Sequence, residues 1–193
     1  MRSMSSAVQT AIGFRIKSGY AIAIVLTGPR ESPTVVARRI VELSDPAVAA
    51  TKQPYHDGFG TEHADPREVA RRITIVERCA KQSVASLVAD THASHAALVV
   101  GSVIDPQQVG NPHIRAHANE GKLFRTVVEE ALRSHGVRCD VIVEKQLAAR
   151  AKAALPLAEA AIKQTVLGFG KAIGGPWRAD EKAAATAAWL ALA

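Results

Sequence analysis

The sequence predicts an α/β fold with a mixed five-stranded sheet flanked by helices, and with a C-terminal helical extension. Three observations lead to this prediction. Three strand-like stretches follow one another near the start, two later apolar strands each follow a helical pattern, and the end of the chain is alanine-rich and helical. Strands at short spacing form an antiparallel meander, whereas strands reached through helices join a sheet in parallel. We expect one domain, 1–193, with a flexible N-terminus over 1–10 and a helical part over 145–193.

The first three predicted strands lie between residues 10 and 44. The stretches "TAIGFRIKS" (10–18) and "GYAIAIVLTG" (19–28) meet at Ser18 and Gly19, a pair that favours a tight turn. A third strand, "PTVVARRIVELS" (33–44), follows the break at Gly28 and Pro29 and is rich in β-branched residues. The stretch 45–65 is predicted to be a loop, and a loop of this length without structure of its own is usually functional or mobile.

Two helices and two further strands follow. Asp65 and Pro66 begin the first helix as N-cap and first residue, and its apolar positions recur every three or four residues. The apolar run "HAALVVGSVID" (95–105) is typical of a strand that is covered on both faces. A second helix is predicted from about Asn119 to Gly136, and "VRCDVIVE" (137–144) is the fifth strand.

The chain from Lys145 onward has a helical pattern. Pro156 separates one helix from the next, because proline interrupts the helical hydrogen bonds. The stretch "GGPW" (174–177) ends that region, and Asp180 begins the last helix, "DEKAAATAAWLALA". Alanine favours helices, and its small side chain indicates close packing.

Composition limits the partners and the location. Hydrophobic residues make up 48% and charged residues 22%, as in an ordinary globular protein. The longest apolar run, Tyr20–Leu26, is too short to span a membrane, and the first ten residues lack the apolar segment of a secretory signal, so we expect a cytoplasmic protein. Cys79 and Cys139 are expected to be buried thiols. The net charge of +6 suits a polyanionic partner such as nucleic acid, but the aromatic content of 4% leaves little for base stacking.

Three stretches resemble those of a known family. "IGFRIKSGYAIAIV" (12–25) resembles its opening strand, turn and Gly-Tyr-Ala second strand, and "AIKQTVLGFGKA" (161–172) is similar to a Val-Lys-x-x-Val followed by Gly-x-Gly-[Arg/Lys]-Ala. "ADEKAAATAAWLAL" (179–192) resembles its last helix, which begins with an acid and continues through alanines. With the order of elements, these stretches resemble the ribonuclease H-like fold and, within it, the bacterial Holliday-junction resolvases.

The resemblance also implies a nuclease that holds two divalent cations with carboxylates of the first strand, the fourth strand and the last helix. This chain departs from that pattern in all three elements. The first strand has Phe14 and Arg15 where the acid is expected, and the fourth strand contains no acid before Asp105. The last helix has Asp180 at the first acid position but Ala183 three residues on. One acid cannot hold two cations that need several oxygen ligands, so we expect the fold without the two-metal activity.

The stretch "NPHIRAHANEGKLFR" (111–125) carries the most suggestive cluster. If it is helical from His113, then His113, His117 and Glu120 lie on one face and can present two imidazoles and a carboxylate to one divalent metal. The alternative is a loop in which Asn119 caps the following helix and Glu120 occupies its first turn. The three residues are the candidate metal ligands, and His117 and Glu120 are also candidate catalytic residues.

Three further candidate catalytic residues come from other segments. His56 and Asp57 lie in "QPYHDGFG" (53–60), which suits either an acid–base pair or a plain surface turn. Asp180 is the acid of the last helix. Basic residues that can flank one groove or form a solvated face are Arg38, Arg39, Arg71, Arg72, Arg78 and Lys81.

Three functions follow from these patterns. The first is a nucleic-acid-binding protein on a resolvase-like scaffold that lacks the standard two-metal site. The second is a hydrolase whose site has moved to the histidines and Glu120. The third is a structural or oligomeric subunit in which Trp177 and Trp189 anchor contacts within a homo-oligomer. A membrane partner is not expected.

Overall fold

The structure is a computed structural model that describes residues 9–58 and 60–192. Most of the predicted flexible N-terminus, 1–10, lies outside the described residues. Within them, no helix is long and apolar enough to cross a membrane.

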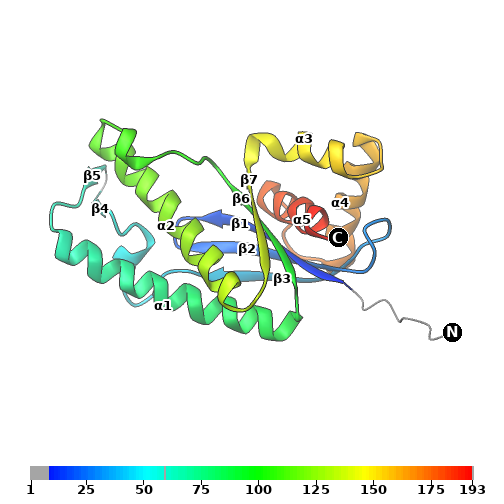
Figure 1. Cartoon of the computed structure of the whole chain (residues 1–193), viewed down its shortest axis with the longest axis horizontal. Coiled ribbons are helices and arrows are strands. Elements are labelled where there is room, and N and C mark those ends of the chain that lie inside the picture. The colour runs from blue at the N-terminus through cyan, green and yellow to red at the C-terminus, as the bar shows by residue number, and fades with distance from the viewer. Residues whose placement is uncertain (1–8, 59, 193) are drawn as a thin grey trace.

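Five strands form one mixed sheet in the order β3-β2-β1-β6-β7 (Figure 1). The antiparallel meander consists of β1 (Thr10–Lys17), β2 (Tyr20–Thr27) and β3 (Thr34–Glu42). It is extended by β6 (His95–Val100) and β7 (Arg138–Val143), which run parallel to β1. The predicted α/β fold with a mixed five-stranded sheet is confirmed.

Helices cover both faces of the sheet (Figure 1). One face is covered by α1 (Pro66–Thr91) and α2 (Pro112–Ser134), and the other by α3 (Glu144–Ala154), α4 (Glu159–Ile173) and α5 (Ala179–Ala191). Each face has its own core, because the central strands are buried on both sides.

β1 sends alternate side chains to the two faces, and this places Arg15 on the side of α5. Phe14 packs in the core beneath α1 and α2, whereas Ala11 belongs to the core beneath α5. A Cβ on Gly13 would lie 1.8 Å from the carbonyl oxygen of Ala184, so glycine is required for α5 to pack this closely on β1. The expected close packing of the alanine-rich end is confirmed, and it brings the start of α5 beside the end of β1.

Three predictions about local structure were wrong. The strand predicted over 95–105 ends at Val100. The second helix begins at Pro112 and not at Asn119, because Asn111 caps it: the Asn111 side-chain oxygen accepts a hydrogen bond from the backbone N–H of Ile114 at 3.1 Å. The predicted loop 45–65 contains a 3-10 turn, η1 (Ala49–Lys52), and a short hairpin of β4 (His56–Asp57) and β5 (Thr61–Glu62). Another 3-10 turn, η2 (Pro106–Gln108), precedes α2.

The tryptophans and cysteines are largely internal. Trp189 is 1% exposed, and its indole N–H donates to the carbonyl oxygen of Arg30 at 2.7 Å. It therefore offers no surface to a partner, contrary to its expected role as an interface anchor. Trp177 packs on Gly170 and is half-buried. Cys79 and Cys139 are free and half-buried, and burial, more than nearby acidic groups, raises the pKa of the Cys139 thiol to about 12.

Candidate functional site

A group of ion pairs lies at the end of β1, where the resemblance puts the cations of a nuclease. Arg15 is 7% exposed, and its guanidinium donates to Oδ1 of Asp180 at 3.1 Å and to Oε2 of Glu144 at 2.6 Å. The ammonium group of Lys17 lies 3.4 Å from Oδ2 of Asp180. We call these four residues the strand-end ion cluster. The permanent charge of Arg15 neutralises the carboxylates that a metal ion would otherwise use.

The strand-end ion cluster does not fit two divalent cations. Such cations need oxygen ligands from several groups. Asp180, the one acid that matches the resemblance, is already paired with Arg15 and Lys17, and the segment that follows β6 faces the cluster with Gly101 and Ser102. A side-chain cation therefore stands where the resemblance implies metal ions.

The neighbouring acid of α5, Glu181, has a structural role. It is 3% exposed and accepts hydrogen bonds from the Arg38 guanidinium at 2.7 Å and from the backbone N–H of Arg178 at 2.9 Å. Burial alone would raise the pKa of Glu181, but these hydrogen bonds outweigh it and lower the pKa below its ordinary value. Glu181 thus caps α5 and ties it to β3, and it does not face the strand-end ion cluster as a substitute ligand.

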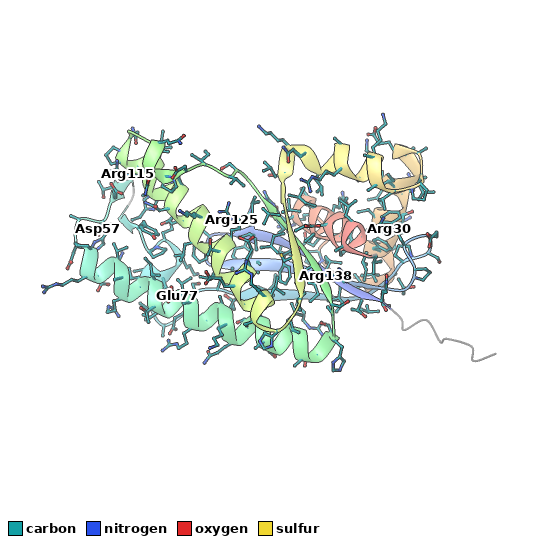
Figure 2. All side chains as sticks on the ribbon, in the orientation of Figure 1. Arg30, Asp57, Glu77, Arg115, Arg125 and Arg138 are labelled. Atoms are coloured by element: carbon teal, nitrogen blue, oxygen red, sulfur yellow. The ribbon has the colours of Figure 1, made fainter. Side chains whose placement is uncertain are left out.

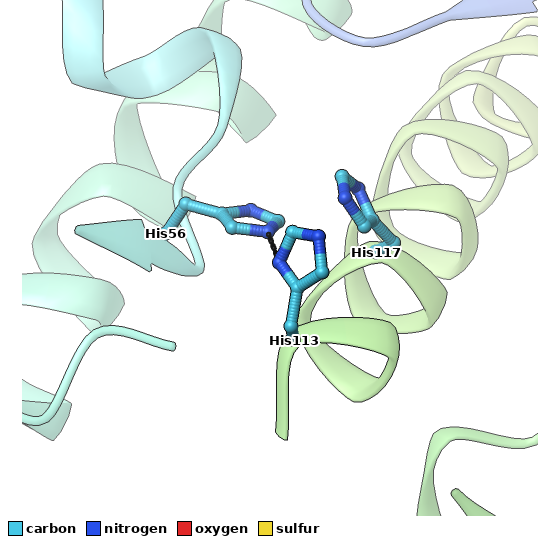
Figure 3. Close-up of side chains that lie close together, drawn as sticks. All are labelled: His56, His113 and His117. Carbon is cyan, nitrogen blue, oxygen red and sulfur yellow. Dashed lines mark hydrogen bonds between the residues drawn. The ribbon is translucent and has the colours of Figure 1, made fainter. Parts of the chain in front are cut away.

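A second group, the histidine cluster, consists of His56, His113, His117 and Glu120. Figure 3 shows its three histidines. His113 and His117 lie one turn apart at the start of α2, and His56 reaches them from β4. One nitrogen of each imidazole lies within 4.8 Å of the other two, and Nε2 of His56 is 3.3 Å from Nδ1 of His113. Three imidazoles at this spacing are able to hold a metal ion.

Glu120 lies behind the His56 ring and is 1% exposed. Its Oε1 is 2.7 Å from Nδ1 of His56, whereas its Oε2 is 3.7 Å from Nδ1 of His117 and has no hydrogen-bond partner among the described residues. Burial raises the pKa of Glu120, although the hydrogen bond to His56 lowers it in part. Burial, and then the neighbouring His56 and His113, lower the pKa of His117, which favours the neutral imidazole that binds metals.

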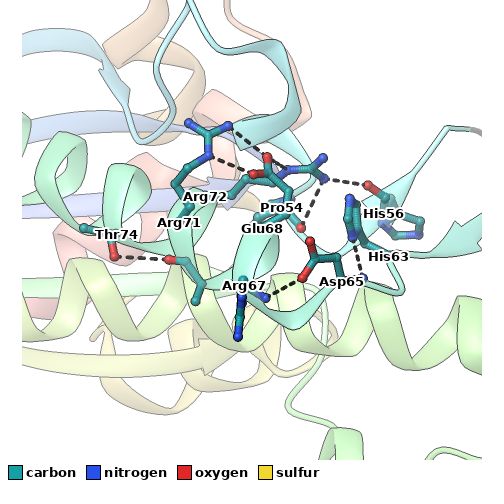
Figure 4. Close-up of polar contacts among 10 residues, drawn as sticks. Pro54, His56, His63, Asp65, Arg67, Glu68, Arg71, Arg72 and Thr74 are labelled. Atoms are coloured by element: carbon teal, nitrogen blue, oxygen red, sulfur yellow. Dashed lines mark hydrogen bonds and ion pairs between the residues drawn. The ribbon is translucent and has the colours of Figure 1, made fainter.

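The hairpin that carries His56 is held by both helices of this face. The guanidinium of Arg72, on α1, donates to the carbonyl oxygen of His56 at 3.0 Å and to Glu68 at 2.9 Å (Figure 4). Arg115, on α2, pairs with Glu62 of β5. Arg72 is therefore a buried positioning residue, and the expectation of a solvated or groove-lining side chain was wrong for it.

The structure brings together four of the predicted site residues and separates two. Those that converge are His56, His113, His117 and Glu120. Asp57 is exposed on the outer side of the hairpin (Figure 2), because neighbouring strand residues point to opposite faces. Asp180 lies in the strand-end ion cluster. His56, not placed among the candidate ligands, supplies the third imidazole, and Glu120 lies behind it.

One pocket of about 250 Å³ is lined by Arg15 and Lys17 of the first group and by His117 of the second. Its walls come from β1, from the segment after β6 and from α2: Arg15, Lys17, Gly101, Ser102, His117 and Gly121. A Cβ on Gly121 would meet nothing within 4 Å, so this glycine relieves no clash and its missing side chain widens the pocket. A larger groove of about 490 Å³ between α3, α4 and α5 has mainly apolar walls and none of the four histidine-cluster residues.

Sequence reasoning missed Glu144 and the role of Arg72. Glu144 directly follows β7, which runs parallel to β1 through β6, so the ends of these strands meet at one edge of the sheet. Because parallel strands end at one edge of the sheet, the position of Glu144 at the end of the fifth predicted strand already indicates an acid near Arg15. Arg72 stands four residues after Glu68, and this spacing indicates an ion pair on a helix. The spacing does not indicate that the Arg72 side chain is buried.

The sequence matches no protein-family model, and no curated protein matches it. Solved structures do match. RuvC of Thermus thermophilus in complex with a Holliday junction substrate is 12% identical, with 94% of this chain and 91% of that chain covered and a TM-score of 0.56. A second Thermus thermophilus RuvC structure has the same identity and TM-score, with 94% and 92% covered. The yeast mitochondrial Holliday junction resolvase Ydc2 is 8% identical, with 93% and 75% covered and a TM-score of 0.50. The chain therefore has a ribonuclease H-like, resolvase-related fold, as the sequence predicts.

Proposed function

We propose that this chain binds structured nucleic acid at the end of the sheet where β1 meets α5, and that it does so without the two-metal cleavage that the resemblance implies. The ion pairs of Arg15 with Asp180 and Glu144 carry the second part of this proposal, because they put a side-chain cation where the metal ions would lie. The fold supports it too, since the Thermus thermophilus RuvC structure is a complex with a Holliday junction substrate.

The expected mode of binding follows from charge. The chain carries a net charge of +6, and Lys17, whose side chain is 36% exposed, lines the pocket beside the sheet end. Contacts from such groups go to phosphates, which carry no sequence information. With an aromatic content of only 4%, base stacking adds little. Binding should therefore be sensitive to salt and tolerant of sequence.

Fluorescence anisotropy of the purified chain with a four-way junction, a duplex and a single strand tests this proposal. We expect affinity to fall steeply as salt increases and to change little with sequence. Lys17→Ala should reduce the slope of log affinity against log salt by about 1, since it removes one phosphate contact. Lys163→Ala is the matched control, because Lys163 is an exposed lysine of α4 that pairs with Glu159. No affinity for any of the three at low salt, or Mg²⁺-dependent cleavage of any of them, would overturn the proposal.

The histidine cluster favours a second candidate, a metal-dependent hydrolase with a relocated site. His117 lines the same pocket as Arg15, so a reactive group there would reach a ligand held by the basic side chains. Hydrolysis that depends on a transition metal and is lost in His117→Ala would support this candidate. If His117→Ala and Glu120→Ala both keep every measured property, the candidate fails.

A further inference from the structure

We propose that His56, His113 and His117 together bind one divalent transition-metal ion of the zinc class, with Glu120 as the residue that orients His56. The site stands apart from the proposed nucleic-acid binding. Only the ligand at its open position, described below, rests on that proposed function.

The distances suit a tetrahedral ion. Zinc binds imidazole nitrogen at about 2.0–2.1 Å, so two nitrogens of a tetrahedral site lie roughly 3.3–3.4 Å apart. The 3.3 Å between Nε2 of His56 and Nδ1 of His113 matches this separation. One nitrogen of each of the three imidazoles lies within 4.8 Å of the other two. The short contact between two ring nitrogens needs one proton between them, and a metal ion can replace that proton.

The donor atoms select the class of ion. Three imidazole nitrogens suit zinc, copper, nickel or iron, whereas magnesium and calcium prefer oxygen ligands. The metal chosen here therefore differs from the hard cations that the resolvase resemblance implies at the strand-end ion cluster. Neutral imidazoles are the form that binds, and His113 and His117 reach the solvent, so an ion can enter.

The buried carboxylate of Glu120 is independent evidence for a cation at the three histidines. This carboxylate is 1% exposed, and its Oε2 has no hydrogen-bond partner among the described residues. A buried carboxylate without full compensation is costly, and a nearby divalent ion offsets its charge. A proton on Nδ1 of His56, donated to Oε1 at 2.7 Å, leaves Nε2 free for the ion. Carboxylates commonly hold metal-binding histidines in this way.

The fourth position of the ion is open toward the pocket. Three protein ligands leave one site of a tetrahedral ion for water or another oxygen ligand. His117, whose side chain is 49% exposed, lines the pocket together with Arg15 and Lys17. The divalent ion itself attracts an anion, so we expect a phosphate oxygen of the bound nucleic acid at the open position.

Isothermal titration of the metal-stripped, tag-free chain with Zn²⁺ tests the site. We expect one ion per chain, and Co²⁺ in its place should give the intense visible absorption of tetrahedral coordination. His117→Ala should weaken binding at least tenfold, and because His117 is half-exposed, this variant should keep the fold. His135→Ala is the control, since His135 is exposed at the other end of α2. Unchanged affinity in a folded His117→Ala variant, or tighter binding of Mg²⁺ than of Zn²⁺, would overturn the proposal.

The variant Glu120→Gln tests whether Glu120 binds the ion itself or only orients His56. Loss of a residue that orients a metal ligand commonly costs 10–100-fold in affinity. We expect a loss of about this size with one ion still bound and with the tetrahedral Co²⁺ spectrum retained. A different Co²⁺ spectrum would show that Glu120 is itself a ligand, and unchanged affinity would remove its positioning role.

Inorganic phosphate and a short duplex test the open position on the Co²⁺-loaded chain. Each should shift the visible spectrum if an oxygen of the added molecule reaches the ion. If Zn²⁺ binds to the three histidines but no nucleic acid binds at all, the proposed function fails and the metal site stands. If nucleic acid binds but Zn²⁺ does not, the metal site fails and the proposed function stands.

Discussion

The strand-end ion cluster and the histidine cluster face the same pocket but balance their buried charge in opposite ways. In the first, the cation is a side chain: Arg15 is buried and pairs with two carboxylates. In the second, the buried charge belongs to Glu120, one of whose oxygens has no hydrogen-bond partner among the described residues, and three imidazoles stand in front of it. In the first group the buried charge of Arg15 is paired within the chain, whereas the second group is suited to receive a cation.

The strand-end ion cluster also ties helices to the sheet. Arg15 joins β1 to α3 and α5 through its ion pairs with Glu144 and Asp180. In the pocket next to it, Gly121 leaves space on the side of α2. His117, a ligand of the proposed metal site, lies in the α2 wall of this pocket.

The largest effect should come from reversing the charge at the strand-end ion cluster. Arg15→Asp removes a buried cation and adds a third carboxylate beside Asp180 and Glu144, so we expect a loss of about 3–5 kcal/mol in the free energy of unfolding. Millimolar Mg²⁺ should restore part of this stability, because the variant gathers oxygen ligands there, and should leave the wild type unchanged. Urea unfolding with and without Mg²⁺ measures both quantities.

Arg71→Asp is the control for that comparison, since Arg71 forms an exposed ion pair with Glu68. It should cost about 1 kcal/mol or less and show no response to Mg²⁺. Equal losses in the two variants would contradict the structural role given to Arg15.

Zinc should stabilise the protein through the histidine cluster alone. At a concentration of about 100 times its dissociation constant, Zn²⁺ is expected to add about 2.7 kcal/mol to the free energy of unfolding. Arg15→Met, although less stable, should keep this increment, and His117→Ala should lose it. Urea unfolding with and without Zn²⁺ measures this increase in the free energy of unfolding. An increase that disappears in Arg15→Met would show that the histidine cluster depends on the strand-end ion cluster.

Gly121 tests whether the pocket between the two groups serves function rather than stability. Gly121→Ala should raise the free energy of unfolding by about 0.5–1 kcal/mol, since alanine favours a helix interior and its Cβ would meet nothing within 4 Å. The same variant should weaken binding of nucleic acid, because it narrows the pocket. Gly13→Ala is the opposite case and should destabilise the fold, as its Cβ would overlap α5. A stabilised Gly121→Ala variant with unchanged binding would count against this use of the pocket.

The smallest expected effect is a change with pH in the stability that Glu181 contributes by capping α5. The folded pKa of Glu181 is lowered, so its contribution to stability is present above the unfolded pKa of about 4.3 and is lost as the pH falls through the lower folded value. The stability difference between wild type and Glu181→Gln should therefore shrink as the pH is lowered from 7 to about 3. Urea unfolding across this range checks it. A difference that is constant with pH would show that the charge of Glu181 is not what stabilises α5.

Much of the fold could be predicted from the sequence, because its main elements are long and strongly patterned. The strands 10–17 and 20–27 and the helix that begins at Pro66 have local signals: apolar runs, a Ser-Gly turn and an Asp-Pro start. The start of α2 was misplaced because Asn111 and Asn119 are both good caps, and only packing selects between them. The hairpin of β4 and β5 has two residues per strand, too few to show a period.

The candidate site could be predicted only where spacing along one element defines it. His113, His117 and Glu120 share a face of α2, and the sequence shows this once the segment is helical. The contact of His56 with Glu120 joins residues 64 positions apart and depends on the folding of the hairpin against both helices. The burial of Arg72 and Glu120 has no local signal, because each is set by the elements packed above it.

The most direct test of this account is an anomalous diffraction experiment at the zinc absorption edge on crystals of the full chain grown with Zn²⁺. The account predicts one peak between the imidazole nitrogens of His56, His113 and His117, and Arg15 still paired with Asp180. A peak beside Asp180 and Glu144, or no peak at the three histidines with zinc in solution, would contradict it.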